Sequence, residues 1–199
     1  VVGSPGRVHA RSGPLRRRGG AASPVGIILS MKLDIVLWPA PVLLDGTDPI
    51  TEVDDEIRQV VGEMRRVMFE LRGVGLAAPQ VGIAKRLMLV CPSGDPGAEE
   101  VILNPEIVKA DGSELGDEGC LSFPDIYGKV PRATTIHVRY QDLDLRPREL
   151  MLDGFVARVF QHEFDHLNGV VFTERMDPAS LEKVEDRLAE LRERFAAAP

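Results

Sequence analysis

The chain has 199 residues, of which 44% are hydrophobic and 28% charged, enough for one compact domain with a substantial core. Its net charge of −7 argues against nucleic acid as the main ligand, because phosphate binding requires a basic face. The apolar runs are too short to form a membrane-spanning helix. There are two cysteines, Cys91 and Cys120, which argues against a disulfide framework and favours a reducing compartment or a metal role.

Residues 1–30 differ in composition from the rest of the chain. They contain five arginines, several glycine, proline and serine residues, and no acidic residue. Such a segment buries too little apolar surface to order itself, so we expect a disordered basic arm, translated upstream of a start at Met31. The alternative is an organellar transit segment, because such segments are also rich in arginine and poor in acids. Residues 31–199 are expected to form a single domain.

Two segments have the apolar periodicity of amphipathic helices. In the first, apolar residues recur at spacings of three and four from Val53 to Leu71, and Thr51 with Asp54 resembles a capping signal at its start. In the second, near the C-terminus, the same spacings run from Leu181 to Phe195. The remaining face of this C-terminal helix mixes acids and bases, so we expect it to face solvent.

Strand signals lie between these two helices. Residues 86–91 are typical of a buried strand, and residues 100–110 of a strand interrupted at Asn104. Alternating apolar residues within 133–152 predict two strands joined by a turn. The glycine-rich segment 72–82 (RGVGLAAPQVG) is predicted to be a loop whose backbone closely approaches another group. Strands clustered between helices indicate an α+β fold.

The segment GFVARVFQHEFDHLNG (154–169) is predicted to be a helix that ends in a left-handed cap. His162 and His166 lie four residues apart, so both imidazoles project from one face of the helix and can bind one metal ion. Glu163 is offset by about 100° around the helix, beside the place of a metal-bound water. This H-E-x-x-H pattern is typical of metallohydrolases. The alternative is an exposed helix with two solvated histidines.

A catalytic metal site needs a third protein ligand and an open fourth position. The metzincin pattern fails, because Phe172 stands where the third histidine is required. Glu185, nineteen residues beyond His166, matches the gluzincin peptidases, although it belongs to an acid-rich helix. Cys120, in DEGCLSFP, is the third candidate, because a thiolate binds divalent iron or zinc strongly. A buried thiol with only a packing role is the alternative for Cys120 and the preferred interpretation for Cys91.

Three segments together resemble the signature motifs of the peptide deformylase family. They are GVGLAAPQ (73–80), EGCLS (118–122) and QHEFDH (161–166), in the family's order and at about its separations. The match in layout covers roughly residues 31–175. The resemblance implies an α+β fold whose mixed or antiparallel sheets pack around a central metal-binding helix. It also implies that residues 31–199 form one catalytic domain.

The resemblance implies a metal site with three protein ligands and water in the fourth place. The implied ligands are Cys120, His162 and His166. Fe²⁺ would be the physiological ion, and Ni²⁺, Co²⁺ or Zn²⁺ could occupy the same site. A metal-bound hydroxide would be the nucleophile and Glu163 the general acid and base. The Gln80 side chain and the Leu121 backbone N–H would stabilise the oxyanion.

The implied reaction removes the formyl group from the N-terminal formyl-methionine of new polypeptides and releases formate. The peptide would lie extended along a strand edge at Gly75 and Gly119, with Val74 and Val159 lining a methionine pocket. The expected partners are N-formylmethionyl nascent peptides in the cytoplasm and, transiently, the ribosome, with no membrane and no specific nucleic acid. A non-catalytic relative that only binds such N-termini is the alternative.

Two positions near the expected substrate groove depart from common bacterial patterns. Tyr127 stands where many bacterial members carry arginine. Arg158, one turn before His162, stands where some members carry an apolar residue. The resemblance therefore does not predict the shape of the pocket rim, whereas all three expected metal ligands are present.

Overall fold

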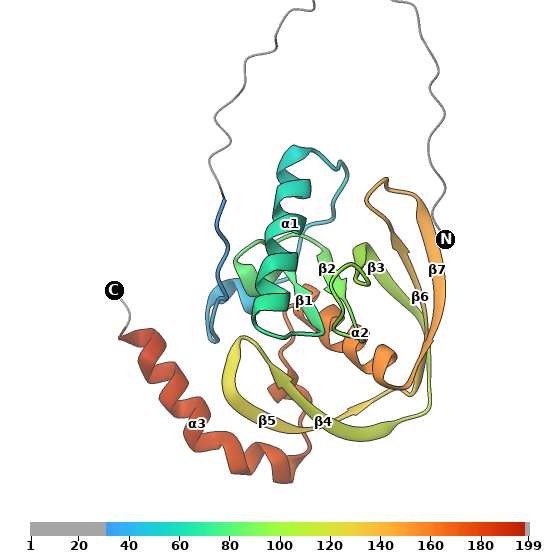
Figure 1. Cartoon of the computed structure of the whole chain (residues 1–199). Coiled ribbons are helices and arrows are strands. Elements are labelled where there is room, and N and C mark those ends of the chain that lie inside the picture. Colours follow the sequence, from blue (N-terminus) through green and yellow to red (C-terminus); the bar gives the residue numbers. More distant parts are fainter. Residues whose placement is uncertain (1–30, 198–199) are drawn as a thin grey trace, which may run out of the picture. The chain divides into compact units, whose positions relative to one another are not determined.

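The computed structural model describes residues 31–197, so the predicted basic arm at residues 1–30 lies outside the described residues. Within residues 31–197, two antiparallel β-sheets and three α-helices make an α+β fold, which confirms the predicted fold class (Figure 1). No helix in that range is both long enough and apolar enough to cross a membrane.

The larger sheet has five strands in the order β1-β2-β3-β6-β7, and every neighbouring pair is antiparallel. Its strands are β1 (Gly75–Ala77), β2 (Leu87–Val90), β3 (Glu100–Asp111), β6 (Thr135–Gln141) and β7 (Pro147–Asp153). Strand β2 is buried along its whole length, as its unbroken apolar run predicts. Strands β6 and β7 form the hairpin predicted from the alternating residues. Strand β1 lies at one edge of the sheet, and its outer edge is therefore unpaired within the sheet.

Two local predictions within this sheet were right only in part. The segment 72–82 is not all loop, because Gly75–Ala77 pairs with β2 and Ala78–Val81 forms a 3-10 turn, η2. Strand β3 continues through Asn104 and Pro105, but its register with β6 shifts there, between Leu103 and Glu106, where the interruption was predicted. Asn104 has a positive φ of 50°, and its side chain bonds the backbone N–H and carbonyl of Ile50. This anchored irregularity lets the strand bend and continue.

The smaller sheet is a hairpin of β4 (Glu114–Cys120) and β5 (Phe123–Arg132). The sequence patterns do not predict β4, because most of its residues are exposed, polar or glycine, so apolar alternation is missing. Strand β5 alternates buried and exposed residues along most of its length, and its buried side chains join the core beneath the C-terminal elements. The hairpin places Cys120 at the end of a strand.

Helix α1 (Asp55–Glu70) confirms the first amphipathic segment. Its N-cap is Asp54, whose side chain accepts a hydrogen bond from the backbone N–H of Ile57 at 2.9 Å. The prediction of Thr51 as the capping residue was wrong, because the helix begins later. The carboxylate of Asp54 accepts from a backbone N–H of the first turn that has no partner within the helix. The buried face of α1 packs in one apolar cluster with residues of β1, β2 and β3.

Helix α2 (Gly154–Leu167) is largely buried and contacts β1, β2, β6 and β7 of the larger sheet. Gly169 follows it with a φ of 71°, as the predicted left-handed cap requires. Helix α3 (Pro178–Ala196) packs against β5 through an apolar stripe that ends at Leu191. Phe195 was predicted to lie on this buried stripe but is 42% exposed. The apolar cluster that α3 forms with β5 does not extend to the last turn of the helix.

Candidate metal centre and active site

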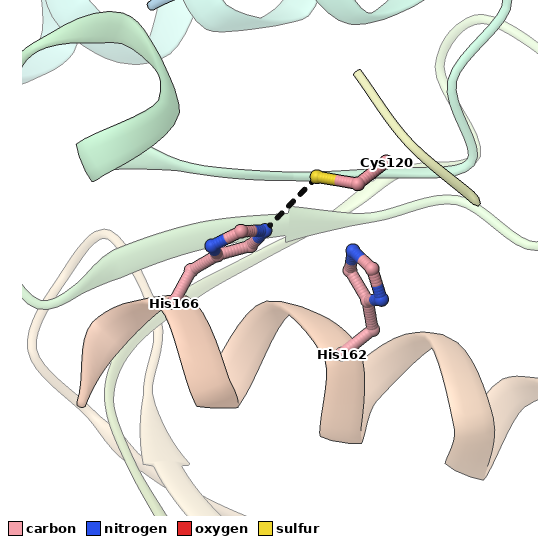
Figure 2. A group of neighbouring side chains, drawn as sticks. All are labelled: Cys120, His162 and His166. Carbon is pink, nitrogen blue, oxygen red and sulfur yellow. Dashed lines mark hydrogen bonds between the residues drawn. The ribbon is translucent and has the colours of Figure 1, made fainter. Parts of the chain in front are cut away.

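Three potential metal ligands converge where the β4–β5 hairpin meets helix α2 (Figure 2). Cys120 lies at the end of β4, and His162 and His166 project from the same face of α2. The three ligand atoms lie within 4.8 Å of one another, and Cys120 Sγ is 3.3 Å from His166 Nε2. Ligands of one tetrahedral ion are roughly 3–4 Å apart, given bonds of about 2.0–2.3 Å. The three side chains are therefore close enough to share a cation.

The chemistry of these donors fits the expected ion. One thiolate and two imidazoles suit Fe²⁺, Zn²⁺, Co²⁺ or Ni²⁺, whereas Mg²⁺ and Ca²⁺ prefer oxygen ligands. Burial alone would lower the pKa of His162. Its hydrogen bonds to Cys120 and Glu118 outweigh burial and hold this pKa well above the ordinary value. Burial lowers the pKa of His166, which keeps that imidazole neutral and able to ligate.

Glu185, the alternative third ligand, lies exposed on α3. Among residues 31–197, the only group of three or more close metal-ligating side chains is the one that contains Cys120 and the two histidines, and Glu185 is not part of it. The geometry therefore favours the thiolate over this carboxylate. Cys91 is fully buried and donates a hydrogen bond to a backbone carbonyl, in agreement with its interpretation as a packing residue.

Glu118 orients one of the two imidazoles. Its carboxylate lies 2.9 Å from His162 Nδ1, which leaves Nε2 as the nitrogen free to ligate. Burial works to raise the pKa of Glu118, but hydrogen bonds from His162 and Arg132 and the charge of Arg132 outweigh burial and lower the pKa to about 2. Glu118 is therefore an anion at neutral pH. The sequence reasoning assigned it no role, although its place in EGCLS, two residues before Cys120, was an available signal.

Glu163 is the second buried carboxylate of the site and is only 4% exposed. Burial raises its pKa to about 7, and its Oε2 has no hydrogen-bond partner among residues 31–197. Gly75 makes room for it, since a Cβ at this position would lie 2.4 Å from Glu163 Oε1. The predicted close approach of the glycine-rich segment to another group is thus found here, and the group is this carboxylate.

Gln80 lies in the 3-10 turn η2 and is almost fully buried. Its side-chain Oε1 accepts a hydrogen bond from the backbone N–H of Ala77 at 2.8 Å, which fixes the amide. Its Nε2 consequently points at the metal centre and donates to Cys120 Sγ at 3.4 Å. Leu121, which directly follows the thiol, lines the same pocket. Both predicted oxyanion donors therefore lie next to the candidate metal ligands.

The site opens into a pocket of about 550 Å³. Its lining includes the four residues predicted to contact substrate, Val74, Gly75, Gly119 and Val159. The same pocket is lined by Gln80, Cys120, Leu121, His162 and Glu163. Three exposed apolar side chains, those of Leu71, Tyr127 and Phe155, also line it. The structure thus gathers the predicted residues around one cavity with an apolar wall; their individual roles remain predictions.

The two unusual positions differ in their surroundings. Tyr127 is 69% exposed, and its ring covers the backbone of Gly119, where a Cβ would lie 2.6 Å from the ring. Arg158 also lines the pocket, but its guanidinium turns away from solvent and reaches Glu118 at 2.9 Å. Tyr127 therefore shapes the pocket wall, whereas Arg158 is paired with Glu118, which in turn contacts His162.

Sequence comparison agrees with this geometry. The family model for polypeptide deformylase matches residues 32–182. A peptide deformylase of Thermotoga petrophila is 42% identical over 140 residues, which cover 70% of this chain and 84% of that protein. A peptide deformylase of Rhodopirellula baltica is 42% identical over 164 residues, which cover 81% of this chain and 82% of that protein.

Solved structures extend the similarity to the fold. A peptide deformylase of Plasmodium falciparum superimposes with a TM-score of 0.81 and 37% identity, over 83% of this chain and 98% of that one. Peptide deformylase 1B of Arabidopsis thaliana gives a TM-score of 0.78 and 38% identity, over 83% of this chain and 92% of that one. Family model, relatives and fold agree, and the chain belongs to the polypeptide deformylase family.

Proposed function

We propose that this protein is a metal-dependent hydrolase that removes the N-terminal formyl group from the formyl-methionine of newly made polypeptides and releases formate. Membership of the deformylase family supports the reaction class. The observation that carries the proposal is the convergence of Cys120, His162 and His166 next to Glu163 in one pocket. We expect the ion to be Fe²⁺, with Ni²⁺, Co²⁺ or Zn²⁺ able to replace it, because all four suit this donor set.

When bound, the ion acts as a Lewis acid that activates water and polarises the formyl group. Glu163 handles the proton in this proposal. Burial brings its pKa to about 7, so its carboxylate can accept a proton and then release it at neutral pH. The unpartnered Oε2 leaves one oxygen available for this transfer to the departing amine. The same side chain therefore serves as general base and then as general acid.

Gln80 and Leu121 are proposed to stabilise the oxyanion that forms when the formyl carbon is attacked. The contact between Gln80 Oε1 and Ala77 leaves the side-chain N–H₂ as the end that faces the centre. The backbone N–H of Leu121 is the second donor. Donors fixed before the reaction need no reorganisation during it, and loss of one commonly costs about 3 kcal/mol of transition-state stabilisation.

The substrate backbone is proposed to bind between two strands. Gly75 lies on β1, an edge strand of the larger sheet, and Gly119 lies on β4 of the hairpin, and both line the pocket. An extended peptide placed there would pair with main-chain groups, which gives affinity with little dependence on side chains. Val74 and Val159 supply an apolar surface for the methionine side chain, whose burial selects for it.

The direct test is formate release from a formyl-methionyl peptide by protein purified without oxygen, with iron, nickel, cobalt and zinc measured in the same sample. Anaerobic handling matters, because an iron–thiolate centre is expected to oxidise. We expect turnover proportional to bound metal, and loss of both in Cys120→Ala. Cleavage of internal peptide bonds, or loss of metal in Glu185→Ala but not in Cys120→Ala, would indicate a peptidase instead. Tight binding of the formyl peptide without turnover would indicate a recognition module.

Three broader expectations stay predictions of the sequence. They are action in the cytoplasm, or in an organelle if residues 1–30 act as a transit segment, a transient association with ribosomes, and the absence of specific nucleic-acid binding. The charged face of α3 is mixed rather than basic, so we expect weak, salt-sensitive association at most. Co-sedimentation with ribosomes at low and moderate salt tests this.

A further inference from the structure

The proposed metal site draws its ligands from two separate elements. Cys120 belongs to the hairpin β4–β5, which forms a sheet of its own, whereas His162 and His166 belong to α2 (Figures 1 and 2). The distance between thiol and imidazoles therefore depends on how the hairpin is attached to the helix. Metal affinity falls when ligands are held loosely, because binding must then order them.

Arg158 is one such attachment. It lies on α2, one turn before His162, and its side chain is only 12% exposed. Its guanidinium donates to backbone carbonyls on both strands of the hairpin, to Glu114 on β4 at 2.7 Å and to Val130 on β5 at 2.8 Å. A third hydrogen bond, of 2.9 Å, goes to the carboxylate of Glu118. A planar guanidinium can serve three acceptors in different directions, which an ammonium group cannot do with the same geometry.

The carboxylate of Glu118 transmits this contact to a metal ligand. Its Oε1 accepts from Arg158 and from Arg132 Nε, both at 2.9 Å. Its Oε2 accepts from Arg132 at 3.0 Å and lies 2.9 Å from His162 Nδ1. Both Glu118 and Arg132 are buried, so the positions of these groups are fixed by one another.

Gly116 provides the space for this arrangement. A Cβ built at Gly116 would lie 2.8 Å from Cζ of Arg158 and 2.8 Å from one of its terminal nitrogens. The guanidinium therefore lies directly against the backbone of β4. An alanine at this position would have to displace the arginine head group, without substituting any proposed metal ligand or Glu118.

We propose that Arg158 is a positioning residue of the metal centre. It fastens the hairpin β4–β5, which carries Cys120, to helix α2, which carries the two histidines, and it holds Glu118 against His162. Gly116 leaves the room that its guanidinium occupies. The inference rests on the metal site of the proposed function but not on the deformylation reaction. Arg158 acts through the hairpin and Glu118, and its contribution is to the affinity for the ion.

The test measures Ni²⁺ affinity by competition with a chelator, and the thiolate-to-metal absorption of the Co²⁺-loaded protein. Loss of a side chain that holds a metal ligand in place commonly weakens metal binding about 10–100-fold. We expect a loss in that range for Arg158→Met, with a shifted Co²⁺ spectrum. Arg158→Lys keeps the charge but not the three-way contact, so we expect a smaller loss in the same direction. These readouts need no turnover, so failure of the deformylation proposal would appear separately in the formate assay.

Arg66→Met is the matched control. Arg66 lies on α1, donates to the backbone carbonyl of Leu33 at 2.8 Å and pairs with Glu63 and Glu70, so it too fastens a helix to another segment. We expect this change to lower the unfolding temperature without weakening Ni²⁺ binding. Equal weakening in Arg66→Met and Arg158→Met would show that general stability is responsible and would overturn the proposal.

Gly116→Ala completes a double-mutant cycle. Alone it is expected to weaken Ni²⁺ binding, and in the Arg158→Met background to add nothing, because the displaced group is absent. If Arg158→Met does not fold, Gly116→Ala and Arg158→Lys still decide the question. Unchanged Ni²⁺ affinity in both, or an effect confined to KM for the peptide, would refute the positioning role and make Arg158 a structural or a substrate-contacting residue.

Discussion

The two buried carboxylates of the site lie in contrasting surroundings. Glu118, on the hairpin, is held by Arg132, Arg158 and His162, and these contacts lower its pKa to about 2. Glu163, on the helix, has a carboxylate oxygen, Oε2, without a hydrogen-bond partner among the described residues 31–197, and burial raises its pKa to about 7. The same functional group is therefore an anion at neutral pH in one region, whereas in the other it is proposed to carry a proton. Placement relative to the ionic network, and not residue type, separates the two roles.

The largest expected effect comes from removing Glu163, the proposed general base and acid. Glu163→Gln keeps the shape of the side chain but cannot take up a proton. We expect kcat to fall about 10²–10⁴-fold, the usual contribution of a general acid–base group, while the metal content stays equal to that of the wild type. The measurements are formate release and metal analysis on the same samples.

Glu185→Gln is the control, because Glu185 is an exposed helical glutamate outside the metal cluster. It should leave turnover and metal content unchanged. If Glu163→Gln lost its metal, Glu163 would be a ligand rather than a base, and the contrast between the two carboxylates would have to be abandoned.

The second-largest effect is expected on the free energy of unfolding and concerns Arg132, the partner of the buried anion Glu118. Arg132 is 3% exposed and bonds both Glu118 and Asp165. Arg132→Met would leave two buried carboxylates short of a partner, which commonly costs about 3–5 kcal/mol. We expect the lower end, about 3 kcal/mol, because Arg158 and Arg175 still contact these acids. Urea unfolding of the metal-free protein measures it.

Arg148→Met provides the comparison for this change. Arg148 pairs with Asp142 on the surface, where ion pairs contribute at most about 1 kcal/mol. If both variants lost the same small amount of stability, the pairing around Glu118 would be no stronger than a surface ion pair.

The third effect is on metal affinity. Glu118→Gln keeps an oxygen that can accept from His162 but removes the negative charge. We expect Ni²⁺ to bind about 10-fold more weakly, at the lower end of the effect of losing a carboxylate that holds a ligating histidine. We expect kcat of the fully loaded enzyme to be nearly unchanged. Glu114→Gln, an exposed change on the same strand, should alter neither quantity. A fall in kcat as large as that of Glu163→Gln would mean that both carboxylates take part in proton transfer.

Local sequence patterns were enough for part of this picture. The periodic apolar residues predicted α1 and α3, and the segment that ends in a left-handed cap at Gly169 predicted α2. The four-residue spacing of His162 and His166 placed both on one helical face. The choice between Cys120 and Glu185 as third ligand needed the family resemblance, because spacing alone allowed both. Geometry then separates them by bringing the thiol to the imidazoles.

The rest could not be predicted from local patterns. Strand β4 lacks apolar alternation, so no period identifies it. The contacts of Glu118 join residues 14, 40 and 44 positions apart, and no short motif specifies such pairs. Likewise, the glycine-rich segment predicted a close approach, but only the fold shows that Gly75 faces Glu163. The sequence thus predicted the three candidate ligands that the fold brings together, whereas the groups that hold them depend on tertiary structure.

The smallest expected effect concerns Tyr140, whose hydroxyl donates to Glu100 at 2.7 Å, away from the metal ligands. Burial, the hydrogen bond and the charge of Glu100 together raise the pKa of Tyr140 well above its ordinary value near 10. Tyr140→Phe should cost about 1 kcal/mol of unfolding free energy at pH 8, the usual net value of one hydrogen bond.

Because the folded-state pKa of Tyr140 is raised, this stabilisation is complete below pH 10 and is lost as pH rises toward the folded-state pKa. The difference between wild type and Tyr140→Phe in urea unfolding should therefore shrink above about pH 10. Tyr127→Phe, which removes a hydroxyl from an exposed ring, is the control. A constant difference for Tyr140→Phe at all pH values would mean that lost packing, not the phenolic proton, accounts for the effect.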